Sequence, residues 1–198
     1  MEAKVMNSRT QTTFFRQDLQ ESLIRSHIDP SRLSTFQKII LTTDGTLTEI
    51  LETYLCEKLQ IVKLGEEIVN TAHDIPLLDI KVDSEVMERK ILLQGKISRN
   101  NWVYAESIII PERLDEVFRE RLIKSQEPIG RLWLERRVET FKEIVDTARE
   151  MAGDLSQYFK INKEDKLLSR TYRVFSNRQP IMMITEKFPE SYFRPEIF

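Results

Sequence analysis

A glutamate interrupts an apolar row near the end of the chain. In the segment PIMMITEKF, residues 180–188, strand alternation places Glu186 on the same side as Met182, Ile184 and Phe188. A charge on an apolar face costs free energy unless it has a partner. A partly desolvated carboxylate can accept a hydrogen bond from a hydroxyl or move a proton. Glu186 is therefore a candidate for ligand binding or acid–base chemistry.

An arginine repeats this irregularity far away in the sequence. In EVMERKILL, alternation puts Arg89 on one face with Met87, Ile91 and Leu93. A guanidinium group is planar and suited to bidentate binding of a carboxylate. Two interpretations are open: Arg89 and Glu186 pair with each other in the interior, or they line a cavity and meet a ligand that carries a carboxylate and a hydroxyl.

The elements that must position these residues are mainly strands joined by hairpins. Alternation and turn residues predict strands over 59–64, 85–97, 101–110, 169–176 and 180–188. The segment 138–149 suits a helix or a strand, and we favour a strand because of its β-branched residues. Strands joined in this way, with helices before and between them, predict a single α+β domain: a mostly antiparallel sheet covered by helices.

Helices are expected on both sides of the turn Asp44-Gly45 and again after the first hairpin. After that turn, Thr46 and Glu49 have the spacing of a capping box at a helix start. Pro111 stops the second strand of the hairpin and begins a helix over 111–125, and a turn leads into a short helix within 127–137.

Length and composition indicate one soluble domain. The 198 residues are 40% hydrophobic and 31% charged, with a formal net charge of -2, which predicts no nucleic-acid-binding surface. No apolar run suits a membrane span, and the N-terminal residues lack the apolar region of a signal peptide, so a cytoplasmic protein without membrane insertion is expected. Residues 1–30 are expected to form a loosely attached N-terminal arm, and 31–198 the domain.

Metal and nucleotide sites are not predicted. His27 and His73 are far apart and lack ligand spacing, and no glycine-rich phosphate loop is present. Cys56, the single cysteine, is expected to be a small buried residue of a helix. Surface charge is the expected role of five arginines, which could also help to hold anions: Arg131, Arg136, Arg137, Arg170 and Arg173.

From about Leu33 to Phe193 the sequence resembles the chorismate pyruvate-lyase family, in its branch of slightly longer proteins. Each matching segment alone is weak, but together and in this order they are specific. The segments are TTDGTLTEIL (42–51), ERKILL (88–93), WVYAESIIIP (102–111), EPIGRL (127–132), ETFKE (139–143) and SRTYRVFSNRQPIMMITEKFP (169–189).

The resemblance implies an antiparallel sheet backed by helices, with the ligand enclosed between sheet and helical flaps. It implies conversion of chorismate to 4-hydroxybenzoate and pyruvate, without metal or organic cofactor. Matched residue by residue, the ligand-binding arginine of the family falls on Arg89 and its acidic residue on Glu186. Leu47 and Ile129 correspond to apolar positions beside the ligand that contribute backbone N–H groups or packing.

The expected mechanism is orientation of chorismate in a dry pocket. Arg89 would hold a carboxylate and stabilise charge on the departing enolpyruvyl group, and Glu186 would bind the ring hydroxyl. One alternative is a non-enzymatic, effector-sensing domain of the same fold, although only about 30 residues precede the resemblance. Another is a silent scaffold in which Arg89 pairs with Glu186. The oligomeric state and the pathway that uses the product are left open.

Overall fold

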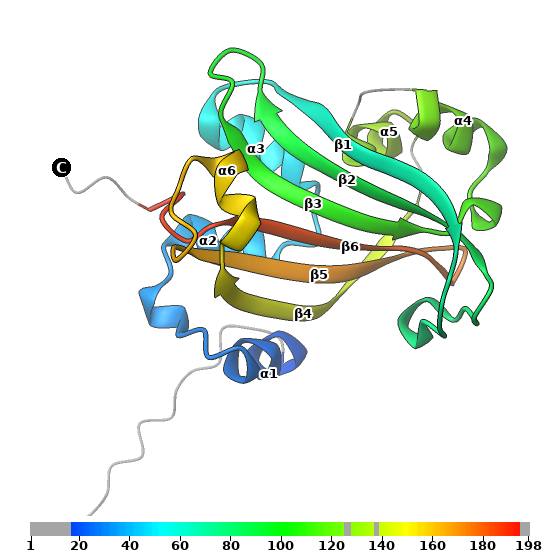
Figure 1. Ribbon diagram of the computed structural model, residues 1–198, viewed down its shortest axis with the longest axis horizontal. Helices are drawn as coiled ribbons and strands as arrows, with labels where there is room; N and C mark the ends of the chain where they lie inside the picture. Colours follow the sequence, from blue (N-terminus) through cyan, green and yellow to red (C-terminus); the bar gives the residue numbers. More distant parts are fainter. Residues whose placement is uncertain (1–16, 125–127, 137–138, 195–198) are drawn as a thin grey trace, which may run out of the picture.

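A six-stranded antiparallel sheet organises the chain in the computed structural model, which describes residues 17–124, 128–136 and 139–194 (Figure 1). The strand order is β1-β2-β3-β6-β5-β4, and every neighbouring pair is antiparallel. The strands are β1 (Leu59–Asn70), β2 (Glu85–Gly95), β3 (Asn101–Ile109), β4 (Phe141–Met151), β5 (Lys166–Ser176) and β6 (Gln179–Pro189). The predicted α+β fold is confirmed, including the strand over the ambiguous segment.

Within the described ranges, six α-helices accompany the sheet. They are α1 (Gln17–Arg25), α2 (Thr35–Thr42), α3 (Leu47–Leu55), α4 (Glu116–Lys124), α5 (Ile129–Arg136) and α6 (Ser156–Phe159). Short 3₁₀ turns occur at Pro30–Arg32, Pro76–Leu78, Pro111–Arg113 and Gly153–Leu155. The break predicted at Asp44-Gly45 is confirmed, because it separates α2 from α3. No helix of the described ranges is long and apolar enough to cross a membrane.

One face of the sheet lies under α2, α3, α4 and α5. Apolar residues of these helices, among them Ile40, Leu51, Phe118 and Trp133, form the main core with the inward side chains of the strands. The opposite face has a smaller cluster in which Phe159 of α6 is buried with residues of β2, β3 and β5. Figure 1 shows α6 on the opposite side of the sheet from α3. The helices on the main face can therefore enclose a site against the sheet.

Helix capping differs from the prediction. Thr46 is the N-cap of α3 but makes no side-chain capping hydrogen bond. The capping box lies instead at α2, where Ser34 and Gln37 bond reciprocally. The prediction of a capping box at Thr46 is therefore wrong, and the first amides of α3 lack that side-chain acceptor.

Cys56 is exposed, so its predicted burial is also wrong. It follows the last residue of α3 and has a left-handed conformation, with φ of 51°. This change of backbone direction ends the helix and turns the side chain away from the apolar helix face.

The described part of the N-terminal arm packs against the sheet. In Figure 1, α1 lies beside β4, which is an edge strand. Leu23 is buried, and the Ser22 hydroxyl accepts from the backbone N–H of Thr147 at 2.7 Å. The Ser26 hydroxyl donates to the carbonyl of the same residue. Residues 22–26 are thus attached to β4 rather than loose.

Candidate functional site

A small cavity lies between the main face of the sheet and the first turns of α3 and α5. Its sheet wall includes Ser107, Ile184, Glu186 and Tyr172, and the predicted residues Leu47 and Ile129 lie on its helical wall. The cavity volume is about 50 Å³. This is room for a few water molecules, so a ring-sized ligand requires the helical wall to move.

Two helix starts meet at this cavity. Residues 46–48 at the start of α3 and 128–130 at the start of α5 contribute to its wall. The first N–H groups of a helix have no acceptor within the helix and carry partial positive charge, which favours an anion. A side chain at Gly130 would clash with Thr46, so glycine permits the close approach of the two helices.

Glu186 is buried and well partnered at the centre of the sheet wall. Only 7% of the residue is exposed. Arg170 Nε donates to Oε2 at 2.7 Å, and the Tyr172 hydroxyl donates to Oε1 at 3.0 Å. These two bonds fix the carboxylate and leave it lone pairs for a further donor. The alternation argument that placed Glu186 on the apolar face is confirmed.

Arg170 and Tyr172 belong to the neighbouring strand β5 and orient the glutamate. Arg170 is 1% exposed and also donates to the carbonyl of Thr43 at 2.8 Å, so the expectation of surface charge is wrong for this arginine. Burial, and secondarily the charge of Glu186, keep the pKa of Tyr172 well above its ordinary value. Tyr172 therefore remains a hydrogen-bond donor over the physiological pH range.

Arg89 is also buried, at 1% exposed, but its surroundings differ. Its Nε lies 3.1 Å from Oε2 of Glu66, yet none of its three guanidinium nitrogens has a hydrogen-bond partner among the described residues. Burial lowers the pKa of Arg89, and the Glu66 carboxylate opposes this shift. A buried guanidinium without hydrogen bonds is an energetically costly arrangement that an anionic ligand would relieve.

The structure places Arg89 beside the cavity wall rather than on it. In the sheet register Arg89 faces Ser107, which lines the cavity, and Ser107 faces Ile184. Glu66 pairs with Arg89, and Arg170 pairs with Glu186. The simple pairing of Arg89 with Glu186 is thus replaced by two separate ion pairs on one sheet face.

Two charged residues near the site were missed from the sequence. Glu66 lies in a part of β1 that was expected to be an irregular connection, beyond the predicted end of the strand at Leu64. Lys142 lies on β4 and lines the cavity, although no pattern singled it out. Both residues would have been identified by a prediction that extended β1 through a bulge and assigned the register of the strands.

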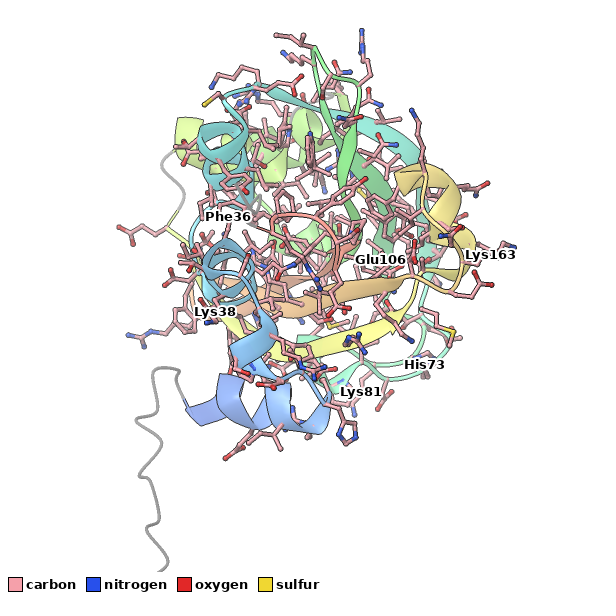
Figure 2. All side chains as sticks on the ribbon, turned by 90° about the vertical axis from the view of Figure 1, so that its left-hand side faces the viewer. Phe36, Lys38, His73, Lys81, Glu106 and Lys163 are labelled. Carbon is pink, nitrogen blue, oxygen red and sulfur yellow. The ribbon has the colours of Figure 1, made fainter. Side chains whose placement is uncertain are left out.

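Histidine is absent from the described cavity wall. Figure 2 shows His73, in the connection after β1, and Lys163, beside α6, at the surface of the molecule. His27 is exposed too. The described ranges contain no group of three or more His, Cys, Asp or Glu residues that could hold a metal ion. Arg136 and Arg137, considered from the sequence as anion-holding residues, have side chains outside the described part.

Solved structures share the fold. The chain superposes on PhnF from Mycobacterium smegmatis with a TM-score of 0.56 and 12% identity, covering 74% of this chain and 64% of that chain. The C-terminal domain of the histidine utilization repressor from Pseudomonas syringae gives a TM-score of 0.52 and 14% identity, with 70% and 96% covered. At such low identities the likeness shows the fold alone.

Similarity in sequence is more specific. The chain is 32% identical over 170 residues to the chorismate pyruvate-lyase of Mycobacterium tuberculosis, covering 82% of this chain and 84% of the relative. It is 30% identical over 161 residues to the chorismate pyruvate-lyase of Mycobacterium leprae, covering 79% and 75%. A family described as chorismate pyruvate-lyase Rv2949c-like matches residues 41–194. The resemblance identified from the sequence is confirmed: this chain belongs to the Rv2949c-like chorismate pyruvate-lyase family of lyases.

Proposed function

We propose that the protein converts chorismate to 4-hydroxybenzoate and pyruvate in the cavity between the sheet and helices α3 and α5. The observation that carries this proposal is the pair of opposite charges on one apolar sheet face. One is an anchored carboxylate, Glu186, and the other is a buried guanidinium, Arg89, that has no hydrogen bond to any described residue. Chorismate carries a ring hydroxyl and two carboxylates, which match these groups. Membership of a chorismate pyruvate-lyase family supports the same substrate.

The reaction is an elimination that makes the ring aromatic. The bond from ring C3 to the ether oxygen breaks with its electron pair on oxygen, C4 loses its hydrogen as a proton, and the former C4–H pair forms the new double bond. The released enolpyruvate gains a proton at its methylene carbon and becomes pyruvate. Because aromaticity drives the reaction, the protein has mainly to orient the substrate and stabilise developing charge.

Glu186 would accept a hydrogen bond from the C4 hydroxyl. Arg170 and Tyr172 already hold the carboxylate in one orientation, so little reorganisation is needed when the substrate binds. The same hydrogen bond places C4 close to a carboxylate that can assist proton transfer.

Arg89 would bind a substrate carboxylate as the helical wall opens beside Ser107. The start of α3 at Leu47 and that of α5 at Ile129 would add backbone N–H groups around the bound anion. After reaction, the apolar wall would retain the flat aromatic product, which predicts slow release and inhibition by 4-hydroxybenzoate.

The direct test is incubation of the purified protein with chorismate while 4-hydroxybenzoate and pyruvate are measured together. Equal amounts of both products are expected, with strong losses in Arg89→Ala and Glu186→Gln. Arg173→Ala is a matched control, because Arg173 is a sheet arginine paired with Glu143 in a row that points away from the cavity. Binding of chorismate without turnover would support the alternative, an effector-sensing domain.

A further inference from the structure

Lys142 brings a second cation to the cavity. It lies on the edge strand β4 opposite Val174, and its side chain lines the cavity together with Glu186 and Tyr172. The Lys142 ammonium donates to the carbonyl of Gly45 at 2.9 Å and lies 5.5 Å from the ring centre of Trp133. Packing over an aromatic ring holds the charged end at the cavity wall.

The Lys142 ammonium has donors to spare. An ammonium group has three N–H donors, and one of them is used by Gly45. Among the described residues no carboxylate forms a direct ion pair with it; Glu186 and Asp44 act on it through longer-range attraction. Burial lowers the pKa of Lys142, and the attraction of Glu186 counters that shift. An anion in the cavity would supply the missing close partner.

The order of the strands places the two cations on opposite sides of β6, the strand that carries Glu186. Arg89 is on β2, Glu186 on β6 and Lys142 on β4, in a sheet with the order β1-β2-β3-β6-β5-β4. Each cation is thus two strands, or about 10 Å, from β6 across the sheet. The register aligns Arg89 with Ile184 and Lys142 with Met182, so both cations are also displaced along the strands from Glu186. In chorismate the C4 hydroxyl has the enolpyruvyl ether on the adjacent carbon and the ring carboxylate across the ring. If the C4 hydroxyl of chorismate binds at Glu186, one of its carboxylates is available to Arg89 and the other to Lys142.

We propose that Lys142 binds the carboxylate of the enolpyruvyl group, while Arg89 holds the ring carboxylate. Lys142 belongs to the half of the site that contains Glu186, since its ammonium lies 5.7 Å from the ring centre of Tyr172, which bonds Glu186. The ammonium, rather than Arg89, then stabilises negative charge on the departing enolpyruvate as the C3–O bond breaks. This inference rests on the proposed function, and it makes Lys142 a determinant of specificity for a dicarboxylate.

Product and substrate differ in the group that Lys142 is proposed to bind. 4-Hydroxybenzoate retains the ring carboxylate and the hydroxyl but has lost the enolpyruvyl carboxylate. Loss of the Lys142 charge should therefore weaken binding of chorismate and spare binding of 4-hydroxybenzoate. A purely structural lysine would weaken both ligands together.

The experiment measures KM for chorismate by steady-state kinetics, or its Kd by calorimetry if chorismate is not turned over, and the Kd for 4-hydroxybenzoate by calorimetry. For Lys142→Met we expect chorismate to bind about 10- to 100-fold more weakly, as on loss of one charge-assisted hydrogen bond. We expect the Kd for 4-hydroxybenzoate to stay within about twofold. Lys142→Arg should recover part of the chorismate affinity, because it keeps the charge.

Lys187→Met is the matched control. Lys187 is a largely buried sheet lysine that pairs with Glu150 at 2.8 Å, away from the cavity wall, so its replacement should change neither affinity. Thermal unfolding of each variant checks that the fold is intact.

The possible outcomes test the role of Lys142 separately from the proposed lyase activity. Unchanged chorismate affinity in Lys142→Met, or equal weakening of both ligands, overturns the role of Lys142 while the lyase assignment stands. A wild-type protein that binds chorismate without forming pyruvate contradicts the lyase assignment, and the two binding measurements still decide the role of Lys142. A wild-type protein that does not bind chorismate overturns both.

Discussion

The two charged ends of the site are held in different ways. Glu186 receives hydrogen bonds from Arg170 and Tyr172, and Arg170 is itself bonded to the carbonyl of Thr43. Arg89 has one close carboxylate, Glu66, and no hydrogen bond of acceptable geometry in the described part of the chain. The hydrogen bonds of the glutamate end are therefore already made, whereas the arginine end would gain partners from the proposed ligand.

Because of this difference, loss of activity and loss of stability should not go together in variants of the two ends. Breaking a complete buried pair leaves an uncompensated charge and destabilises the fold. Removing a buried cation with unmade hydrogen bonds relieves a cost that is already present. Variants at the two ends should thus lose activity together but differ in stability.

Replacement of Arg89 by methionine should have the largest effect on catalysis. We expect kcat/KM for chorismate to fall about 10²- to 10³-fold, the size seen when one charge-stabilising donor is lost. The free energy of unfolding, measured with urea, should change by less than about 1 kcal/mol, because Glu66 keeps its ion pair with Lys63. A strongly destabilised Arg89→Met would show that Glu66 already satisfies the guanidinium, and the contrast between the ends would be lost.

Glu186→Gln should lose about 10²-fold in kcat/KM and also destabilise the protein. The amide keeps the shape but leaves the buried Arg170 without its counter-charge, which costs about 3 kcal/mol. The same urea measurement provides the comparison with Arg89→Met. Glu143→Gln is the control, since it removes a carboxylate from the more exposed pair with Arg173. Equal stability losses at Glu186 and Arg89 would contradict the comparison.

Tyr172→Phe should have a smaller effect, about 10-fold in kcat/KM and about 1 kcal/mol in stability, as for loss of one hydrogen bond. The remaining Arg170 bond keeps Glu186 in place but less strictly oriented. Kinetics and thermal unfolding of the same sample test this. If Tyr172→Phe were as inactive as Glu186→Gln, the tyrosine itself would have to contact the reacting atoms.

Alkaline pH should weaken chorismate binding gradually. The Lys142 pKa is lowered from its ordinary value of 10.5, so the ammonium loses its proton as pH rises through that lower pKa. Around it, Glu186 and Asp44 favour the charged form and Arg170 disfavours it, while Tyr172 stays protonated. KM for chorismate is therefore expected to rise on an alkaline limb that begins below pH 10.5.

The matched variant for this limb is Lys142→Arg. Its guanidinium does not titrate in this range, so the rise in KM should disappear. An alkaline limb that persists unchanged in Lys142→Arg would assign the titration to another group.

Sequence patterns could predict the fold and the inward direction of Arg89 and Glu186. Alternation is reliable there, because β2 and β6 are central strands with one regularly buried face. The partners could not be predicted. The register shifts between Lys63 and Gly65, and this bulge at Leu64 reverses the alternation and turns Glu66 toward Arg89. Lys142 faces the cavity from an edge strand that also carries a register shift, after Ile144.

Arg170 illustrates a second reason why the partners of Arg89 and Glu186 could not be predicted from the sequence. Its sequence neighbourhood, SRTYRVFS, contains two arginines on opposite faces of β5, and only the pairing of β5 with β6 shows which one is inward. Such information comes from three-dimensional contacts rather than from periodicity within one segment. Prediction therefore found the unusual charges and missed the groups that compensate them.

The attachment of α1 to β4 has a consequence for the behaviour of the protein in solution. An edge strand presents unpaired N–H and C=O groups that can template intermolecular strand addition. The hydroxyls of Ser22 and Ser26 occupy both backbone groups of Thr147, in the middle of that edge. The first described helix thus covers the β4 edge of the sheet against strand addition at Thr147, a task that other proteins assign to charges or prolines on the edge strand.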